Sequence, residues 1–576
     1  MSAHAATAEH ASIMVLDEEP IEPLSAPVDR EPRAGATAAA TVAIAGFLCF
    51  ATFLARGGLD LSRMTTLELT TTLLAGALVS GAVLVAAREL RARGLWSVGL
   101  LLAFAGLTGI SVVWSVAPDA SWQDAGRMLS YSGLFAAAVA LAWIAPGGWR
   151  ALLGATVLAA VLVCAYALLT KVLPGDLGLS AEANLYARLQ EPYGYWNAIG
   201  LTAAMGTIGC LWLGARRAGH ALLSALAYPA TGLLIVTLML AYSRGALAAL
   251  AIGVAAWMCL VPLRLRGARV LIVGGVCAAP VVAWDFSRHA LSGDGVALAV
   301  RAHAGHQLGA LLLAMLVLLS LIGIAIGFFG DRRAPTASTR RTVGIALASL
   351  LVLLLLAGVG GLAATKRGLT GTISHDLSSL TNPNAPVPAN TPGRLTAVGS
   401  VRARYWKEAL EIFKAHPVLG AGAAGYETAR LRYRTQLLDV RQAHGYVVQT
   451  LADLGIAGLA VSLALLLAWM AAAGRPTHPF NRRWTFRRPE GEGSGVSRLR
   501  SAPSLSWGHA PQAYTPERIG MLTMLCIVIV FGVHSFADWT WYVPGDAFVA
   551  LLCAGWLAGR GPLPVGNLAA PAGSPE

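Results

Sequence analysis

Residues 307–329 form the stretch QLGALLLAMLVLLSLIGIAIGFF, in which no charged side chain occurs. A helix needs roughly 20 mainly apolar residues to cross the hydrocarbon core of a bilayer, so this stretch is long enough for one crossing. Similar stretches recur along nearly the whole chain. Because a backbone in lipid must pair its own polar groups, each of them predicts a helix. The short alternating segments typical of transmembrane strands are missing.

The sequence predicts an all-α integral membrane protein of about 12–14 transmembrane helices. The predicted spans are 35–55, 66–87, 95–114, 129–146, 150–173, 197–214, 221–241, 245–263, 268–286, 307–329, 342–364, 446–472, 519–536 and 544–560. They leave one large loop, 365–445.

Composition supports this class of protein. Of the 576 residues, 56% are hydrophobic and 13% are charged, and the charged share is about half that of a soluble globular protein. The net charge of +13 comes almost entirely from arginines spread among the loops. That pattern suits a lipid bilayer and anionic substrates, and it does not predict a nucleic-acid partner.

Charge in the short loops predicts the orientation. Short loops with several arginines alternate with loops that carry mostly single charges, which predicts that both termini are cytoplasmic. Segments 1–34 and 473–518 lack apolar periodicity and predict a disordered cytoplasmic tail and a disordered cytoplasmic loop. The predicted order is the tail, helices 1–11 over 35–364, the extracytoplasmic loop 365–445, helix 12 over 446–472, the loop 473–518, helices 13–14 over 519–560, and a cytoplasmic tail 561–576.

All seven cysteines lie inside apolar stretches, which argues against a disulfide framework and against a zinc site. No Gly-rich phosphate loop, D-x-D pair or His/Glu metal spacing occurs, so we expect no nucleotide, metal or other cofactor. Glu68 is the main carboxylate at membrane depth. Such residues are functional candidates, although Glu68 is near the start of its span and could reach the interface.

The large outer loop is strongly basic, which fits either a solvated surface or a docking surface for a phosphorylated, lipid-anchored substrate. Ser374–Gly393 is rich in Pro, Asn, Ser and Thr and predicts irregular structure. Val401–His416 predicts a helix with Trp406, Leu410 and Phe413 on its apolar face. Pro417 and the following glycines end it.

Two arginines in this helix point in different directions. Arg402 shares a face with Trp406 and could stack on it while offering its guanidinium fork to a phosphate. Arg404 points roughly 200° away. Ion pairing with Glu408 and Glu411 explains Arg404, or Arg404 binds a phosphate together with Arg402.

His444 lies just before the span that opens near Tyr446. A helix N-terminus disfavours an imidazolium, so a neutral imidazole there could accept a proton from an attacking hydroxyl. A structural histidine at the interface is the alternative. Further candidates lie at outer helix ends. They are Arg244 in the turn Tyr242–Gly245, Asn197 after the aromatic segment 191–196, Asp453, His534 and Asp538.

Together these motifs resemble the O-antigen ligase and polymerase family of bacterial membrane proteins, over most of the chain from about residue 95. The resemblance rests on Arg402 four residues before Trp406, on the HPVLGAG turn at 416–422 and on the segment that begins at His444 and contains Asp453. Ser243-Arg244-Gly245, Asn197 and the His534-Ser535…Asp538 element add to it. Gly445 and Asp453 replace the Asn or Ser and the Glu that are usual in the family.

The resemblance implies a GT-C-like glycosyltransferase that needs no metal. Its donor would be an undecaprenyl-diphosphate-linked glycan, and its acceptor a hydroxyl on a glycan, lipid or protein outside the membrane. Arg244 and Arg402 would hold the diphosphate and His444 would assist the acceptor. A polymerase that extends lipid-linked repeats, a non-enzymatic transporter and a scaffold or sensor with a large outer loop are the alternatives.

Overall fold

The computed structural model describes residues 34–86, 93–177, 186–216, 220–329, 367–385, 388–437, 439–477 and 514–563, together with individual positions between 338 and 363. Within these residues the protein is helical, and no strand is present. Eleven helical segments of this part of the chain are long and apolar enough to cross a membrane. The prediction of an all-α integral membrane protein is therefore confirmed.

The chain forms the helices α1 (Ala34–Leu54), α2 (Leu61–Ala86), α3 (Leu95–Ile110), α4 (Pro118–Ile144), α5 (Trp149–Val172), α6 (Trp196–Ala215), α7 (Ala221–Ala225), α8 (Ala227–Leu240), α9 (Arg244–Leu260), α10 (Arg264–Ser287), α11 (His289–Ser292), α12 (Leu298–Phe329), α14 (Gly368–Thr381), α15 (Arg402–Ala415), α16 (Tyr426–Ala429), α17 (Tyr446–Thr477), α18 (Pro516–Ala537) and α19 (Pro544–Arg560).

Each predicted span coincides with helical structure except 342–364, most of which lies outside the described residues. The segments 1–34 and 473–518, predicted to be disordered, and the predicted tail 561–576 also lie outside them, apart from their edges. The largest boundary error concerns α4, predicted from 129 and observed from Pro118. Its first turns carry Asp124 and Arg127, which are buried and paired at 2.8 Å. Because the charges neutralise each other inside the protein, they do not end the helix as their hydropathy suggested.

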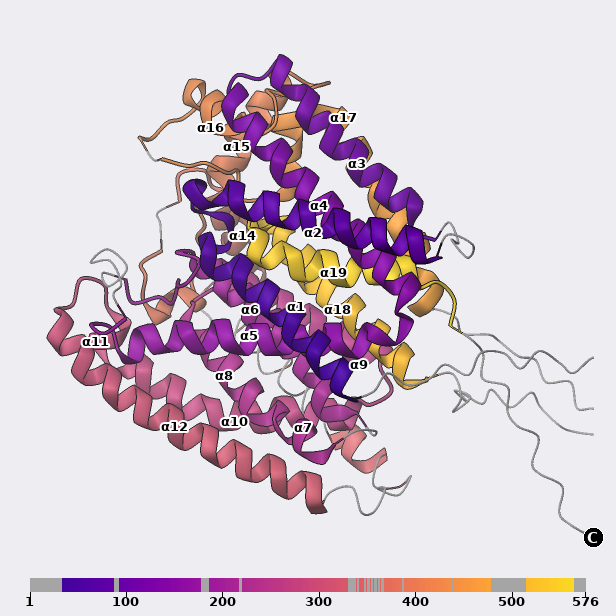
Figure 1. The fold of residues 1–576 in the computed structure, drawn as a ribbon. Coiled ribbons are helices and arrows are strands. Elements are labelled where there is room, and N and C mark those ends of the chain that lie inside the picture. The colour runs from indigo at the N-terminus through magenta and orange to yellow at the C-terminus, as the bar shows by residue number, and fades with distance from the viewer. Residues whose placement is uncertain are drawn as a thin grey trace, which may run out of the picture.

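Helix α6 forms the centre of the bundle (Figure 1), and almost all of its residues are buried. It packs against α5, α8, α9 and α18. Small residues permit this close approach, as is usual between membrane helices. A Cβ on Gly206, for example, would lie 2.5 Å from Cβ of Ala160. The packed core therefore fixes the first turn of α6, which contains Asn197 and directly follows Tyr195.

Helices α14, α15 and α16 gather at one end of the bundle (Figure 1). They belong to the large loop 365–445. The expectation of irregular structure over Ser374–Gly393 was wrong for its first part, because α14 continues to Thr381. Loop residues can form a helix when their local pattern allows it, and the Ser and Thr side chains here bond to backbone carbonyls within the helix.

Helix α17 is broken at Gly455, where the sequence predicted one continuous span. Gly455 has φ 60° and ψ −155°, a backbone conformation found essentially only in glycine. The amide of Ile456 donates to the Pro417 carbonyl at 2.9 Å, and that of Ala457 to the Val418 carbonyl at 3.1 Å. The turn that follows α15 thus caps the second half of α17 and joins the outer loop to the membrane bundle.

We expect Gly455→Ala to destabilise the protein by at least about 2 kcal/mol, the cost of a residue forced into such a conformation. A Cβ there would also lie 2.4 Å from the Val418 carbonyl oxygen. Thermal unfolding in detergent measures the effect. Gly474→Ala in the same helix is the matched control, because no atom lies within 4 Å of its Cβ position. Equal unfolding temperatures for the two variants would contradict the assignment of the break to Gly455.

Candidate active site

Asp538 is the centre of the candidate site. It directly follows α18, and only 1% of its side chain is exposed. Its Oδ1 accepts hydrogen bonds from the Tyr195 hydroxyl at 2.6 Å and the Trp539 amide at 2.8 Å, and its Oδ2 accepts one from Asn197 Nδ2 at 2.7 Å. The structure thus brings two candidate residues from the sequence, Asn197 and Asp538, into direct contact.

Arg402 is the first residue of α15 and pairs with Asp538. Its Nη2 lies 2.5 Å from Asp538 Oδ2, and 22% of its side chain is exposed. Burial alone raises the pKa of Asp538, but the charge of Arg402 holds it well below its ordinary value. Asp538 is therefore an anion that orients the guanidinium while part of Arg402 stays open to a ligand.

The predicted apolar face of α15 was wrong in detail. Tyr405, Ala409 and Ile412 form the buried face, whereas Leu410 is 41% exposed. Trp406 Nε1 donates to the His444 carbonyl at 3.0 Å. One helix therefore positions both Arg402 and the histidine.

His444 approaches the second carboxylate oxygen of Asp538, Oδ1. Its Nδ1 is 3.6 Å from Asp538 Oδ1, and its ring stacks on Tyr405 with centroids 5.4 Å apart. The backbone at His444 has φ 55°, a conformation that non-glycine residues adopt only when their surroundings enforce it. Nδ1 faces the Asp538 carboxylate without forming a hydrogen bond, and 23% of the side chain is exposed.

Arg244 enters the site from the membrane bundle. The turn before it is tight, with φ 48° at Tyr242, and the Ser243 hydroxyl caps α9 by accepting from the Ala246 amide. Arg244 Nη1 donates to the Ala397 carbonyl and Nη2 to the Gly399 carbonyl, the latter at 3.0 Å. The turn predicted at Tyr242–Gly245 is present, and it brings Arg244 against the outer loop.

His534 is buried beside this turn. Its Nδ1 lies 3.0 Å from the Thr540 hydroxyl, and its Nε2 has no hydrogen-bond partner and faces Gly245. A Cβ on Gly245 would lie 3.3 Å from Nε2. The small residue in the Ser-Arg-Gly sequence is therefore needed for the close packing of α9 on α18.

Two predicted residues lie elsewhere. Arg404 is 4% exposed and donates to the Pro383 carbonyl and to Gln436 Oε1. Its expected partner Glu408 instead pairs with Arg430 at 2.7 Å. Neither contact brings Arg404 to Asp538, so the structure gives no support to its predicted place among the diphosphate-binding arginines.

Asp453 acts on the site through the backbone. Its Oδ1 accepts from the Tyr426 amide at 2.9 Å and its Oδ2 from Gln449 Nε2 at 2.8 Å. Gln449 Oε1 in turn accepts from the Ala443 amide. Asp453 therefore holds the residue before His444 and the turn after α15, and its carboxylate has no direct contact with the group around Asp538.

The sequence did not single out Arg188, Arg394 or Tyr195. Tyr195 belonged to the aromatic segment 191–196, and Arg394 was one of many cations in the outer loop. Arg188 lies over the Trp196 ring at 4.2 Å and donates to the carbonyls of Ala241 and Tyr242. The one local signal was the stretch Glu191–Asn197, which follows Arg188. Its aromatic side chains can form contacts inside the protein as well as lie at a membrane interface.

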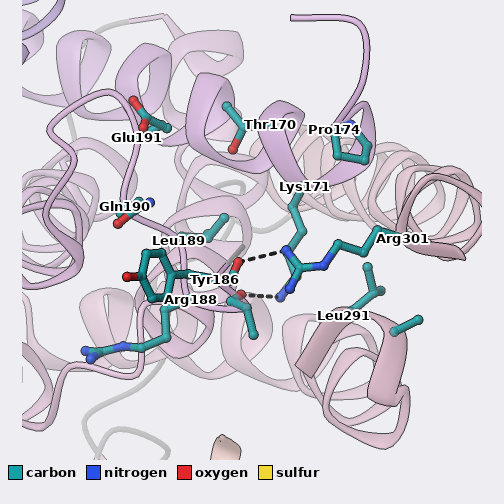
Figure 2. A pocket seen from close by; sticks show the side chains of 12 residues that line it. Thr170, Lys171, Pro174, Tyr186, Arg188, Leu189, Gln190, Glu191, Leu291 and Arg301 are labelled. Atoms are coloured by element: carbon teal, nitrogen blue, oxygen red, sulfur yellow. Dashed lines mark hydrogen bonds between the residues drawn. The ribbon is translucent and has the colours of Figure 1, made fainter. Parts of the chain in front are cut away.

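Figure 2 shows how the loop that carries Arg188 is held. Lys171 Nζ donates to the Ala187 carbonyl at 3.1 Å, and Arg301 Nη1 donates to the Tyr186 carbonyl at 3.0 Å. The side chain of Arg188 points away from both cations (Figure 2). A cavity of about 40 Å³ between them has room for a few water molecules and not for a sugar ring.

Glu68 lies in a different group of charges. A Cβ on Gly126 would be 2.7 Å from Glu68 Oε2, which places Glu68 beside the Asp124–Arg127 pair of α4. Its Oε1 is buried without a hydrogen-bond partner. No contact joins this group to Asp538. Within the described part of the chain, no three His, Cys, Asp or Glu side chains gather closely enough to hold a metal ion.

The comparison with protein families agrees with these motifs. A family model described as O-Antigen ligase matches residues 298–463. This segment is therefore similar to an O-antigen ligase domain. It contains α12, α15 and the first part of α17, and with them Arg402 and His444. No curated protein matches the chain.

The family domain alone does not complete the site. Arg244, Asn197 and Asp538 lie outside residues 298–463 and reach Arg402 and His444 through the fold. The match is also shorter than the resemblance predicted, which extended from about residue 95. The matched segment 298–463 therefore supplies the histidine and one arginine, and the remaining membrane helices supply the carboxylate and the second arginine.

Proposed function

We propose that the protein transfers a glycan from an undecaprenyl-diphosphate-linked donor to an acceptor hydroxyl on the extracytoplasmic face of a bacterial inner membrane, with both termini in the cytoplasm. In the reaction the bond between the anomeric carbon and the diphosphate oxygen breaks. A bond between the same carbon and the acceptor oxygen forms. The acceptor proton passes to His444, and undecaprenyl diphosphate leaves with the bonding electron pair.

One observation carries this proposal, namely the approach of Arg402 and His444 to the two carboxylate oxygens of Asp538. Arg402 could stabilise negative charge that grows on the leaving diphosphate, since donors placed where charge develops lower the barrier. Asp538 beside Nδ1 would keep Nε2 free to accept a proton. Arg244 supports the same reading, because it reaches this end of the bundle through the capped turn before α9.

The test is a transfer assay with purified protein, an undecaprenyl-diphosphate-linked glycan and membrane extract from the host as a source of acceptors. We expect release of undecaprenyl diphosphate coupled to the appearance of a glycosylated acceptor. Products of stepwise increasing length on the lipid would identify a polymerase, whereas single transfer of the finished chain would identify a ligase.

A transporter predicts another result. Movement of the lipid-linked glycan across a vesicle membrane, with no diphosphate released under any acceptor condition, would contradict the proposed transferase. Because the released lipid is measured directly, the assay does not depend on knowing the acceptor in advance.

A further inference from the structure

The site contains more positive charge than the two arginines of the proposed reaction. Arg394 and Arg402 both repel Arg244 electrostatically, and Arg394 also repels Arg188. Four guanidinium groups thus share one region. Of these, Arg402 alone has a carboxylate partner among the described residues, Asp538.

Arg394 reaches this region on a segment that we call the strap, residues 388–400 of the outer loop. The strap is fastened at both ends. Near its start, Asn390 Nδ2 donates to Asp294 Oδ2 at 3.1 Å, and Arg188 Nη1 lies 3.5 Å from Asn390 Oδ1. Near its end, Arg244 donates to the carbonyls of Ala397 and Gly399. Arg394 therefore has a fixed place between two anchored points.

The immediate surroundings of Arg394 do not neutralise it. Its Nη1 donates to the Pro388 carbonyl, and the side chain is half-buried. Burial lowers the pKa of Arg394 below its ordinary value, and the charge of Arg402 lowers it further. The same causes, burial first and then the charge of Arg394, lower the pKa of Arg188 to about 9. Clustered cations that disfavour their own charge become more stable when an anion binds.

The count of charges indicates which anion would fit. Four guanidiniums and one carboxylate leave three positive charges in excess. A diphosphate that links a sugar to a lipid carries two negative charges, and it gains a third when the sugar bond breaks. The last excess charge is therefore matched as the third negative charge develops on the leaving diphosphate in the transition state, which is the state that a transferase must stabilise.

We propose that Arg394 is a further diphosphate-binding residue, delivered by the strap, and that Arg188 is a positioning residue which holds both the strap and the turn before Arg244. This inference rests on the proposed function and names a third guanidinium of the same site. Arg188 is 3% exposed and touches carbonyls, so it shapes the site without reaching the ligand. Arg394 keeps accessible surface and can reach it.

The experiment measures binding of undecaprenyl diphosphate to the detergent-purified full chain, with undecaprenyl monophosphate as the second probe. We expect Arg394→Ala to bind the diphosphate about 10- to 100-fold more weakly, the loss typical of a hydrogen bond to a charged group. Binding of the monophosphate should change less. Arg394→Lys, which keeps the charge and loses the fork, should fall between Arg394→Ala and the unaltered protein.

Arg434→Ala is the matched control, because Arg434 is an exposed arginine of the same outer loop. Unfolding temperatures of all variants show whether the strap is still folded. Diphosphate binding by Arg394→Ala and Arg394→Lys equal to that of Arg434→Ala would overturn the inference and leave the proposed transfer intact. If the unaltered protein neither bound the diphosphate nor released it from the donor, both proposals would fail together.

Discussion

Arg402→Ala is expected to lower the rate of glycan transfer by about 100- to 1,000-fold, the effect of removing one donor from a charge-stabilising site. Arg402 is the guanidinium that Asp538 orients at 2.5 Å, and part of its side chain remains open. Initial rates of undecaprenyl diphosphate release measure the loss. Arg402→Lys should recover a small part of the rate, because an ammonium keeps the charge and cannot make the bidentate contact.

The loss should not come from unfolding. Asp538 keeps three hydrogen bonds when Arg402 is removed, from Tyr195, Asn197 and the Trp539 amide. The carboxylate therefore keeps hydrogen-bond partners. Breaking a buried ion pair costs most when the remaining charge has no partner. Lys407→Ala, on the exposed face of the same helix, is the control. Equal rates for Arg402→Ala and Lys407→Ala would refute a role for Arg402 in stabilising the leaving group.

The membrane helices were predictable because their signal is local. The stretch 307–329 needs no information from the rest of the chain to indicate a helix, and α12 contains it completely. The errors arose where charges are neutralised inside the protein, as in the first turns of α4. The break in α17 depends on carbonyls of Pro417 and Val418, which come from another segment, so the pattern after His444 could not reveal it.

The site was predictable to the extent that single side chains had unusual places. Arg402 looked out of place on an apolar face, whereas His444, Asn197 and Asp538 were candidates through their places at helix ends and through the family resemblance. The fold brings the four together. Arg404 looked similar to Arg402 in sequence, and only its contacts with Pro383 and Gln436 separate the two. Arg188 and Arg394 were missed because their positions depend on the strap, whose course has no signature in the sequence.

His444→Asn is expected to lower the turnover rate by about 100- to 10,000-fold, the range for loss of a general base. Asn is chosen because it tolerates the positive φ at this position better than other residues. His444→Asn therefore tests the loss of the base with little added backbone strain, whereas His444→Ala combines the loss of the base with backbone strain. If the imidazole accepts the proton, both variants lose turnover, whereas a purely structural role would let Asn recover most of it.

The same variants separate catalysis from binding. His444 faces Asp538 through Nδ1 and is assigned to the acceptor, so its replacement should leave the affinity for undecaprenyl diphosphate within about twofold, a change of less than 0.5 kcal/mol. His416→Ala is the control, since His416 is an exposed histidine just after α15. Weakened diphosphate binding together with unchanged turnover at saturating donor would move His444 from the acceptor side of the reaction to the donor side. Full turnover in both His444 variants would remove it from the chemistry altogether.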